Sequence, residues 1–109
     1  MTTTDPSAPP QVFARYLTVA GSALTDPALA VHITVDVTDS RHHETSTLRP
    51  GRIDMWGRIT CTGCHMSTET CGGNDYDQED RESMSAYLAD KSRPAAQAHA
   101  EKCRAMPGQ

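Results

Sequence analysis

The sequence predicts a small α+β domain, with two or three antiparallel strands followed by a C-terminal helical segment. Two stretches alternate apolar and polar residues with the period of a strand, and the C-terminal part has apolar residues at helical spacing. The third observation is a lean core, because only 37% of the 109 residues are apolar, five are aromatic and four are cysteine. A domain this short buries a limited share of its surface, so the cysteines are expected to supply a covalent or metal cross-link.

The N-terminal part is expected to contain a disordered tail and one short element. Residues 1–11 hold three prolines and four Thr or Ser residues but no core-forming side chain, a composition that is typical of disorder. A single domain is expected over residues 12–105, and residues 106–109 are expected to form a C-terminal tail. In residues 12–21 the apolar positions fit one face of a helix, but alternate residues also fit a strand, and both interpretations stay open.

Two strands are expected in the middle of the chain. Residues 31–37 alternate β-branched apolar residues with polar ones, which is typical of a half-buried strand. Residues 38–51 are polar and contain turn-forming residues, so we expect a loop, or a hairpin with a short strand near residues 45–48. A second strand, residues 53–60, alternates in the same way and runs directly into Cys61.

The part that follows Cys71 is expected to be a loop and then helical. Residues 72–77 are rich in glycine and acidic residues, a composition that favours a loop. Acidic residues then precede apolar residues at helical spacing, which predicts a helix from about residue 79 to residue 90. Ser-Arg-Pro at 92–94 has the pattern of a helix cap followed by a first-turn proline, and the alanine-rich residues 95–105 predict a second helix or a kinked continuation.

Composition and charge narrow the location and the partners. No apolar run approaches the roughly 20 residues of a membrane span, and the N-terminus lacks the basic and apolar parts of a signal peptide. We therefore expect a cytoplasmic protein without a membrane partner, in which closely spaced cysteines bind metal more often than they form disulfides. The formal net charge of −4 has the wrong sign for non-specific attraction to phosphate.

Four residues have the spacing of metal ligands. Cys61 and Cys64 form a C-x2-C turn at a strand end, whereas His99 and Cys103 form an H-x3-C pair in the predicted last helix. Residues four apart on a helix lie on one face, with Cβ atoms about 5–6 Å apart. Three thiolates and one imidazole suit Zn²⁺ in a closed tetrahedral site, which is structural because no position is left for water or substrate. The 34 residues between the two pairs exceed the usual spacing of about 12–15, but closure entropy rises slowly with loop length.

Cys71 leaves the ligand set partly open. It could replace His99 or Cys103 as the fourth ligand, although a free thiol in a mobile loop is the favoured interpretation. His65 is expected to be an exposed loop residue, and His32 lies on the polar side of its strand.

The same C-x2-C motif is compatible with other chemistry, which the rest of the sequence disfavours. Residues 61–65 match the attachment motif of a c-type haem, but haem attachment requires export and would leave His99 and Cys103 unexplained. A thioredoxin-like redox motif would begin a helix, whereas glycines and acidic residues follow here. No paired carboxylates, Ser-His-Asp set or phosphate-binding loop is recognisable, so we expect a protein that is not an enzyme and has no small-molecule substrate.

Three short sequence blocks carry a resemblance to other proteins: RYLT at 15–18, TCTGC at 60–64 and AHAEKCRAMP at 98–107. Together they resemble a group of small, mostly uncharacterised actinobacterial proteins, some of them associated with phages and mobile elements. In that group a C-x-G-C knuckle and a C-terminal HAxxC helix look like a zinc-finger pair. The resemblance implies that Cys61, Cys64, His99 and Cys103 are the metal ligands, and it implies no particular activity.

Two classes of macromolecular partner stay open. A protein partner is favoured, because the acidic balance suits it and Trp56 lies opposite the apolar positions of its strand, where it could be an interface anchor. With the register reversed, Trp56 would instead be a core residue. The alternative is a nucleic-acid-binding regulatory zinc finger. Residues 91–109 carry four basic and one acidic residue, whereas residues 1–90 carry six basic and thirteen acidic residues, so only the last helix could face phosphate.

Overall fold

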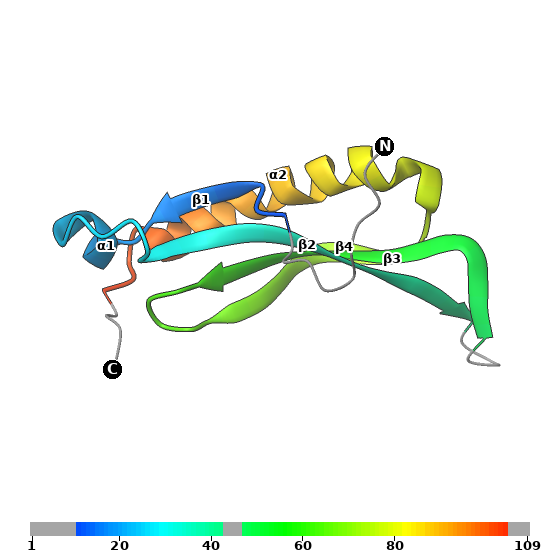
Figure 1. Ribbon diagram of the computed structural model, residues 1–109, viewed down its shortest axis with the longest axis horizontal. Helices are drawn as coiled ribbons and strands as arrows, with labels where there is room; N and C mark the ends of the chain where they lie inside the picture. Colours follow the sequence, from blue (N-terminus) through cyan, green and yellow to red (C-terminus); the bar gives the residue numbers. More distant parts are fainter. Residues whose placement is uncertain (1–10, 43–46, 105–109) are drawn as a thin grey trace.

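The computed structural model, which describes residues 11–42 and 47–104, shows one antiparallel sheet and one long helix (Figure 1). The four strands are β1 (Ala14–Leu17), β2 (Ala30–His42), β3 (Thr47–Cys61) and β4 (Ser67–Asp77). The helical elements are the short α1 (Val19–Ala23), the 3-10 turn η1 (Gln78–Asp80) and the long α2 (Arg81–Ala100). The α+β prediction is confirmed, but the sheet has four strands instead of two or three.

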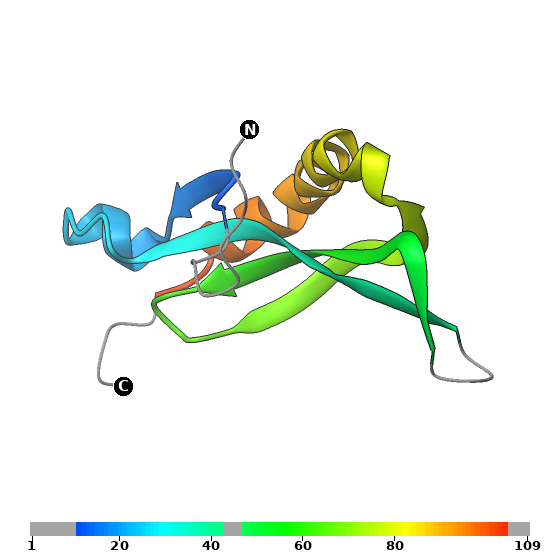
Figure 2. The same ribbon diagram turned by 45° about the vertical axis from the view of Figure 1, so that its right-hand side comes forward.

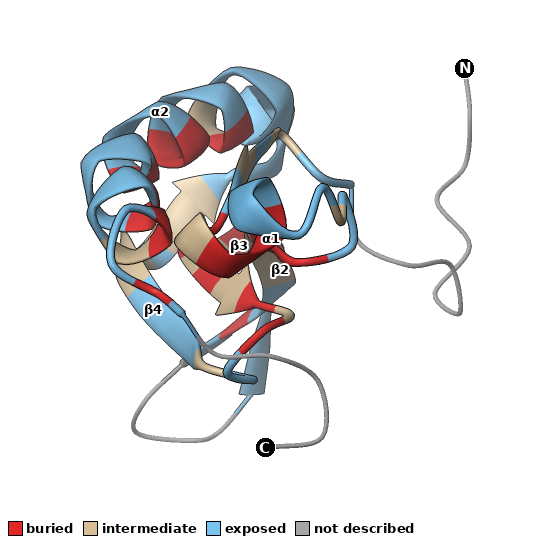
Figure 3. Ribbon diagram, turned by 90° about the vertical axis from the view of Figure 1, so that its left-hand side faces the viewer, coloured by how far each residue is buried: buried red, intermediate tan, exposed pale blue. Residues whose placement is uncertain are grey.

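The strands lie side by side in chain order, and each neighbouring pair is antiparallel. The hairpin of β2 and β3 is the longest pairing, and it reaches from Val31 opposite Cys61 to His42 opposite Thr47. The helix α2 lies across one face of the sheet, which Figure 2 shows from a second direction. Seen end-on in Figure 3, buried residues gather where α2 faces the strands. The other face of the sheet is not covered by α2.

The core has two parts along the helix. The larger one lies at the end where β3 stops, and it combines strand residues with small residues of α2 and with a cysteine beyond it: Val31, Ile33, Ile59, Cys61, Ala89, Ala96, Ala100 and Cys103. The smaller one lies towards the start of α2 and consists of Ile53, Met55 and Leu88. Alternation along the strands produces both parts, because every second side chain points to the helix.

Helix and sheet approach each other most closely between the two parts of the core. A Cβ atom on Gly57 would lie 2.6 Å from Oγ of Ser92 and 3.0 Å from Oγ1 of Thr70. These two hydroxyls are hydrogen-bonded at 2.6 Å, and the Ser92 hydroxyl donates to the carbonyl of Leu88 at 2.8 Å. A side chain at position 57 would therefore have to displace these hydroxyls or widen the gap between α2 and β3.

Both interpretations of residues 12–21 are correct for part of the segment. Ala14–Leu17 pair with β2, and a helical turn begins directly afterwards at Val19. Thr18 separates the two elements, because its buried Oγ1 accepts the Gly21 N–H at 2.9 Å as an N-cap. The same hydroxyl donates to the carbonyl of Leu29 at 3.3 Å, which fixes the start of α1 beside the start of β2.

Of the two alternatives for residues 38–51, the loop is wrong for most of the segment and the hairpin is correct. Strand β2 continues to His42 and β3 begins at Thr47, so the polar residues form the arms of a long hairpin. The expected short strand near residues 45–48 corresponds to the first residues of β3, and its positions 45 and 46 lie outside the described residues. In Figure 1 the end of this hairpin extends past the start of α2, and its polar side chains are mostly exposed, with Ser40 as a buried exception.

The prediction of a loop over residues 72–77 is also wrong, because these residues complete β4. Gly72 lies opposite Trp56 with φ of 140°, and its missing Cβ leaves room for the indole. Asp75 adopts a positive φ of 67° at an irregular part of the pairing. Its carboxylate accepts from Arg49 and from the Ser40 hydroxyl, so cross-strand partners neutralise the charge that suggested a loop.

The two predicted helices are one helix. Residues Arg81–Ala100 are continuous, with Pro94 in the interior, so the predicted separate second helix is wrong and the alternative, a continuation of the first helix, is correct. The helix also ends five residues earlier than the predicted end at residue 105. The predicted tails, residues 1–11 and 106–109, lie outside the described residues except for Gln11. Neither helix within residues 11–42 and 47–104 combines the length and the apolar character that a membrane crossing requires.

Candidate metal centre

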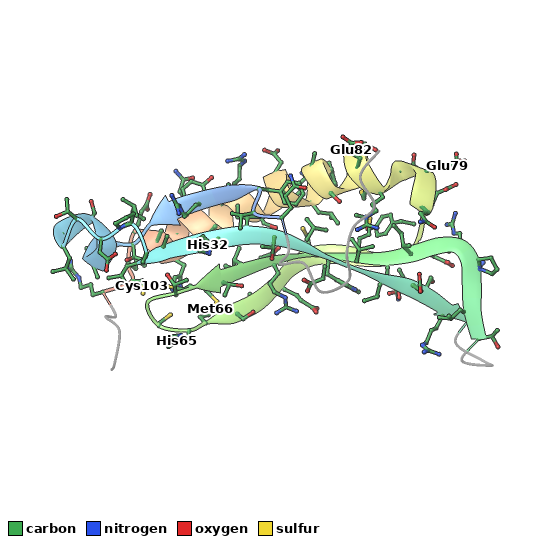
Figure 4. All side chains as sticks on the ribbon, in the orientation of Figure 1. His32, His65, Met66, Glu79, Glu82 and Cys103 are labelled. Carbon is green, nitrogen blue, oxygen red and sulfur yellow. The ribbon has the colours of Figure 1, made fainter. Side chains whose placement is uncertain are left out.

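All four predicted ligands meet at one end of the molecule. Their ligand atoms, the Sγ atoms of Cys61, Cys64 and Cys103 and a ring nitrogen of His99, all lie within 4.8 Å of one another. Cys61 and Cys103 are buried, His99 is half-buried and Cys64 is exposed. Figure 4 shows Cys103 close to the turn between β3 and β4, far from Glu79 and Glu82 near the start of α2. Within the described part of the chain, no other group of three such residues is close enough to hold a metal ion.

Two of the six distances between the ligand atoms are close to those of a tetrahedral site. The Sγ atoms of Cys61 and Cys103 are 3.7 Å apart, and Sγ of Cys64 lies 3.3 Å from Nε2 of His99. Around a tetrahedral ion with metal–sulfur bonds of about 2.3 Å and metal–nitrogen bonds of about 2.0 Å, neighbouring ligand atoms are about 3.8 Å and about 3.5 Å apart. All four cysteines are free, so no disulfide competes for these sulfurs. The residues therefore fit a metal ion of this size.

The turn that carries Cys64 is anchored on both sides. The N–H of Cys61 donates to the carbonyl of Met66 at 2.8 Å and closes the turn, in which His65 has a positive φ of 63°. Thr62 binds the start of β2, because its N–H donates to the carbonyl of Ala30 at 3.0 Å and its Oγ1 accepts the Ala30 N–H at 3.0 Å. The Thr62 hydroxyl also donates to the carbonyl of Ala28. These bonds fix Cys61 and Cys64 relative to the sheet.

The second pair of ligands comes from the end of α2. His99 lies in the last turn, but the prediction that Cys103 lies in the helix is wrong, because α2 ends at Ala100. The N–H of Cys103 still donates to the carbonyl of His99 at 2.9 Å, so one helical turn of spacing is kept. The carbonyl of Cys103 accepts the N–H of Ala20 in α1 at 3.3 Å. The short N-terminal helix therefore holds the fourth ligand in place.

Cys71 lies outside this cluster. Its placement in a mobile loop is wrong, because Cys71 lies in β4, half-buried and packed against the smaller part of the core. Its Sγ is 3.6 Å from the carbonyl of Leu88 and 3.9 Å from Oγ of Ser92. His65 is exposed in the turn, as expected. His32 lies on the sheet face that α2 leaves open, where partial burial and the nearby positive charge of Arg15 lower the pKa of its imidazole.

The open sheet face carries a polar network that the sequence analysis missed. Arg58 in β3 donates to Asp36 in β2 at 2.7 Å and to Glu69 in β4 at 3.0 Å, which links three strands. The hydrogen bond with Asp36 raises the pKa of the Arg58 guanidinium. Trp56 is half-buried, and it lies between Asp36 and Gly72 in the pairing of the strands. The predicted register is confirmed, because Trp56 points away from the core.

No protein-family model, curated protein or solved structure matches this chain. The site is therefore assigned from the geometry of its residues.

Proposed function

We propose that this chain is a non-enzymatic binding module in which Cys61, Cys64, His99 and Cys103 hold one structural Zn²⁺. The observation that carries the proposal is the meeting of four ligand atoms within 4.8 Å, from two parts of the chain that lie on different elements. Three sulfurs and one nitrogen are a ligand set that zinc prefers, and all four tetrahedral positions would be taken by protein. The cytoplasm, in which thiols stay reduced, suits such a site.

The composition of the core explains why this fold benefits from an ion. The residues that α2 contributes to the larger part of the core are Ala89, Ala96 and Ala100, whose small side chains bury little apolar area. When bound, Zn²⁺ would join the end of β3 to the end of α2 and would supply binding free energy as folding free energy. The metal would thus replace the large apolar side chains that this end of the helix lacks.

Cobalt substitution tests the ligand set. Reduced, metal-free protein should bind one equivalent of Co²⁺ and develop the intense absorption of a tetrahedral ion with thiolate ligands, and Zn²⁺ should abolish that absorption. The variant Cys71→Ser should give the same spectrum, because Cys71 lies outside the cluster. Weak absorption, or binding that does not saturate at one equivalent, would contradict the tetrahedral Cys3His assignment.

The open sheet face supports a protein as the partner. Trp56 is half-buried there, beside the network of Asp36, Arg58 and Glu69. A tryptophan surrounded by polar groups is a frequent anchor of protein interfaces. The absence of a Cβ on Gly72 leaves room for the indole of Trp56, since such an atom would lie 3.0 Å from Cε3 of the ring.

The basic residues of α2 give less support to nucleic acid as the partner than the open sheet face gives to a protein. Lys91 lies over the ring of Tyr87, with its Nζ 5.5 Å from the centroid. Arg93 donates to the hydroxyl of Tyr16 at 2.9 Å and pairs with Asp90 at 3.3 Å. Two of the four basic residues that could face phosphate therefore already contact other residues of this chain. The formal net charge of the protein is −4, which also disfavours binding to phosphate.

Binding experiments distinguish the two partner classes. Titrations of labelled duplex and single-stranded DNA with zinc-loaded protein should show no saturable binding at low or high salt. Binding that weakens steeply with salt would support the nucleic-acid alternative instead. A purified protein partner should bind Trp56→Ala at least about tenfold more weakly than wild type, as expected for an interface tryptophan. The variant Tyr87→Ala is the matched control, since Tyr87 is exposed on α2.

A further inference from the structure

The three sulfurs of the metal centre differ in accessibility. Cys61 and Cys103 belong to the buried core, and their exposed fractions are 0% and 9%. Cys64 is exposed, at the tip of the β3–β4 turn. Since thiolate character and exposure together decide which cysteine an oxidant reaches, Cys64 is the sulfur that a solute meets first.

A resolving sulfur is already in place. The Sγ atoms of Cys61 and Cys103 both lie within 4.8 Å of Sγ of Cys64. Cys61 shares the turn with Cys64, and the hydrogen bond from its N–H to the carbonyl of Met66 keeps that turn closed. Cys103 lies beyond the end of α2, on a separate segment of the chain. Cys61 is therefore the better partner for a disulfide.

We propose that Cys64 is an oxidation site, at which a hydroperoxide converts Cys64 and Cys61 to a disulfide and releases the metal ion; this inference rests on the proposed zinc site. The Cys64 sulfur attacks one peroxide oxygen, so an S–O bond forms, the O–O bond breaks, and the leaving oxygen takes a proton from water. The Cys61 sulfur then attacks the sulfenic sulfur, an S–S bond forms, and the hydroxide that leaves is protonated. Two thiolates, one hydroperoxide and two protons become a disulfide, water and an alcohol, or two waters from hydrogen peroxide itself.

The consequence is confined to one end of the fold. The disulfide removes two of the four ligands, so His99 and Cys103 alone cannot retain the ion. The end of α2 then loses its link to β3, whereas Ile53, Met55 and Leu88 still pack at the other end. Oxidation would thus separate the end of α2 from β3. Reduction of the disulfide and addition of fresh Zn²⁺ would restore the link.

Peroxide treatment of zinc-loaded protein tests the inference. The expected result is release of one Zn²⁺, measured with a chromogenic chelator, together with the loss of two thiols at the same rate. Cys61, Cys64 and Cys71 all lie in the tryptic peptide 59–81, so the experiment uses the Cys71→Ser background. There, loss of two hydrogens within this peptide identifies the Cys61–Cys64 disulfide, and a cross-link to Cys103 overturns the assignment of Cys61 as the partner.

Two further measurements separate the inference from the zinc proposal. The variant Cys64→His keeps four ligands, so it should retain Zn²⁺ and release it roughly tenfold or more slowly under peroxide. Limited alkylation of zinc-loaded wild-type protein should modify Cys64 before either buried ligand. Release from Cys64→His at the wild-type rate, or first alkylation at Cys61 or Cys103, overturns the inference. Wild-type protein that carries no Zn²⁺ before peroxide is added overturns the zinc proposal itself.

Discussion

The Sγ atoms of Cys61 and Cys103 lie 3.7 Å apart, although 42 residues separate the two cysteines in the chain. Cys61 is the last residue of β3, and Cys103 follows the end of α2. The pair therefore brings the sheet and the segment after α2 together. The pair meets because hydrogen bonds hold both sides: Thr62 fixes the turn to β2, and Ala20 donates to the carbonyl of Cys103. The metal centre thus depends on neighbours that provide no ligand.

Thr62→Val should weaken the metal centre without removing a ligand. The substitution keeps the size of the side chain but removes the oxygen that accepts the Ala30 N–H at 3.0 Å. The loss of this bond, and of the one that the hydroxyl donates to the carbonyl of Ala28, should lower the free energy of unfolding by about 1–3 kcal/mol and reduce zinc affinity. Urea unfolding and zinc competition titrations measure the two effects. Thr68→Val, at an exposed position of β4, should stay within about 0.5 kcal/mol of wild type.

Gly57→Ala should push α2 away from the sheet. The new Cβ would lie 2.6 Å from Oγ of Ser92, so we expect a loss of about 1–3 kcal/mol in the free energy of unfolding. Adding Ser92→Ala removes the closest atom and should recover part of the loss. Denaturant unfolding of the two single variants and the double variant checks this. Independent, additive effects of the two substitutions would show that the close contact is not the cause.

The Arg58–Asp36 pair should contribute modestly to stability. Both side chains are about one-third exposed, at 29% and 35%, so water screens their 2.7 Å contact. A double-mutant cycle with Arg58→Ala and Asp36→Ala should give a coupling energy of about 0.5–1 kcal/mol that decreases with added salt. A coupling energy near zero at low salt would show that the Arg58–Asp36 pair does not stabilise the fold.

His32 should make the domain less stable in mild acid. Burial, and to a lesser extent Arg15, lower the pKa of His32 in the folded protein below the unfolded value of 6.5. The unfolded state therefore binds more protons between the two pKa values, and the stability that neutral His32 contributes at higher pH is lost as the pH falls through the folded pKa. Wild type should lose more stability than His32→Gln between about pH 7.5 and about pH 5. Equal losses in both proteins would place the acid sensitivity elsewhere, for example at the metal ligands.

The sequence was most informative where local periodicity and tertiary structure agree. Alternation along residues 31–37 and 53–60 predicted the first half of β2 and the second half of β3, because these parts of the strands are buried on one face only. Ligand spacing predicted all four members of the cluster, since C-x2-C and H-x3-C fix which atoms can converge on one ion.

The missed elements depend on partners far away in the chain. Residues 72–77 have the composition of a loop, but they pair with β3, where Gly72 lies opposite Trp56 and the arginines of β3 bind Asp75. A separate second helix was expected beside the continuation because proline favours a helix start locally. Packing of Ser92 and Ala96 against the sheet, on either side of Pro94, keeps the helix in one piece.

Native mass spectrometry of the purified protein, with and without chelator, tests the central claim most directly. Wild type and Cys71→Ser should each carry one Zn²⁺, whereas His99→Ala and Cys103→Ala should lose both the ion and the folded charge-state distribution. Metal-free wild-type protein that stays folded would contradict the structural role of the site. A covalent haem mass after expression with export and maturation machinery would instead show that residues 61–65 serve as a haem attachment motif.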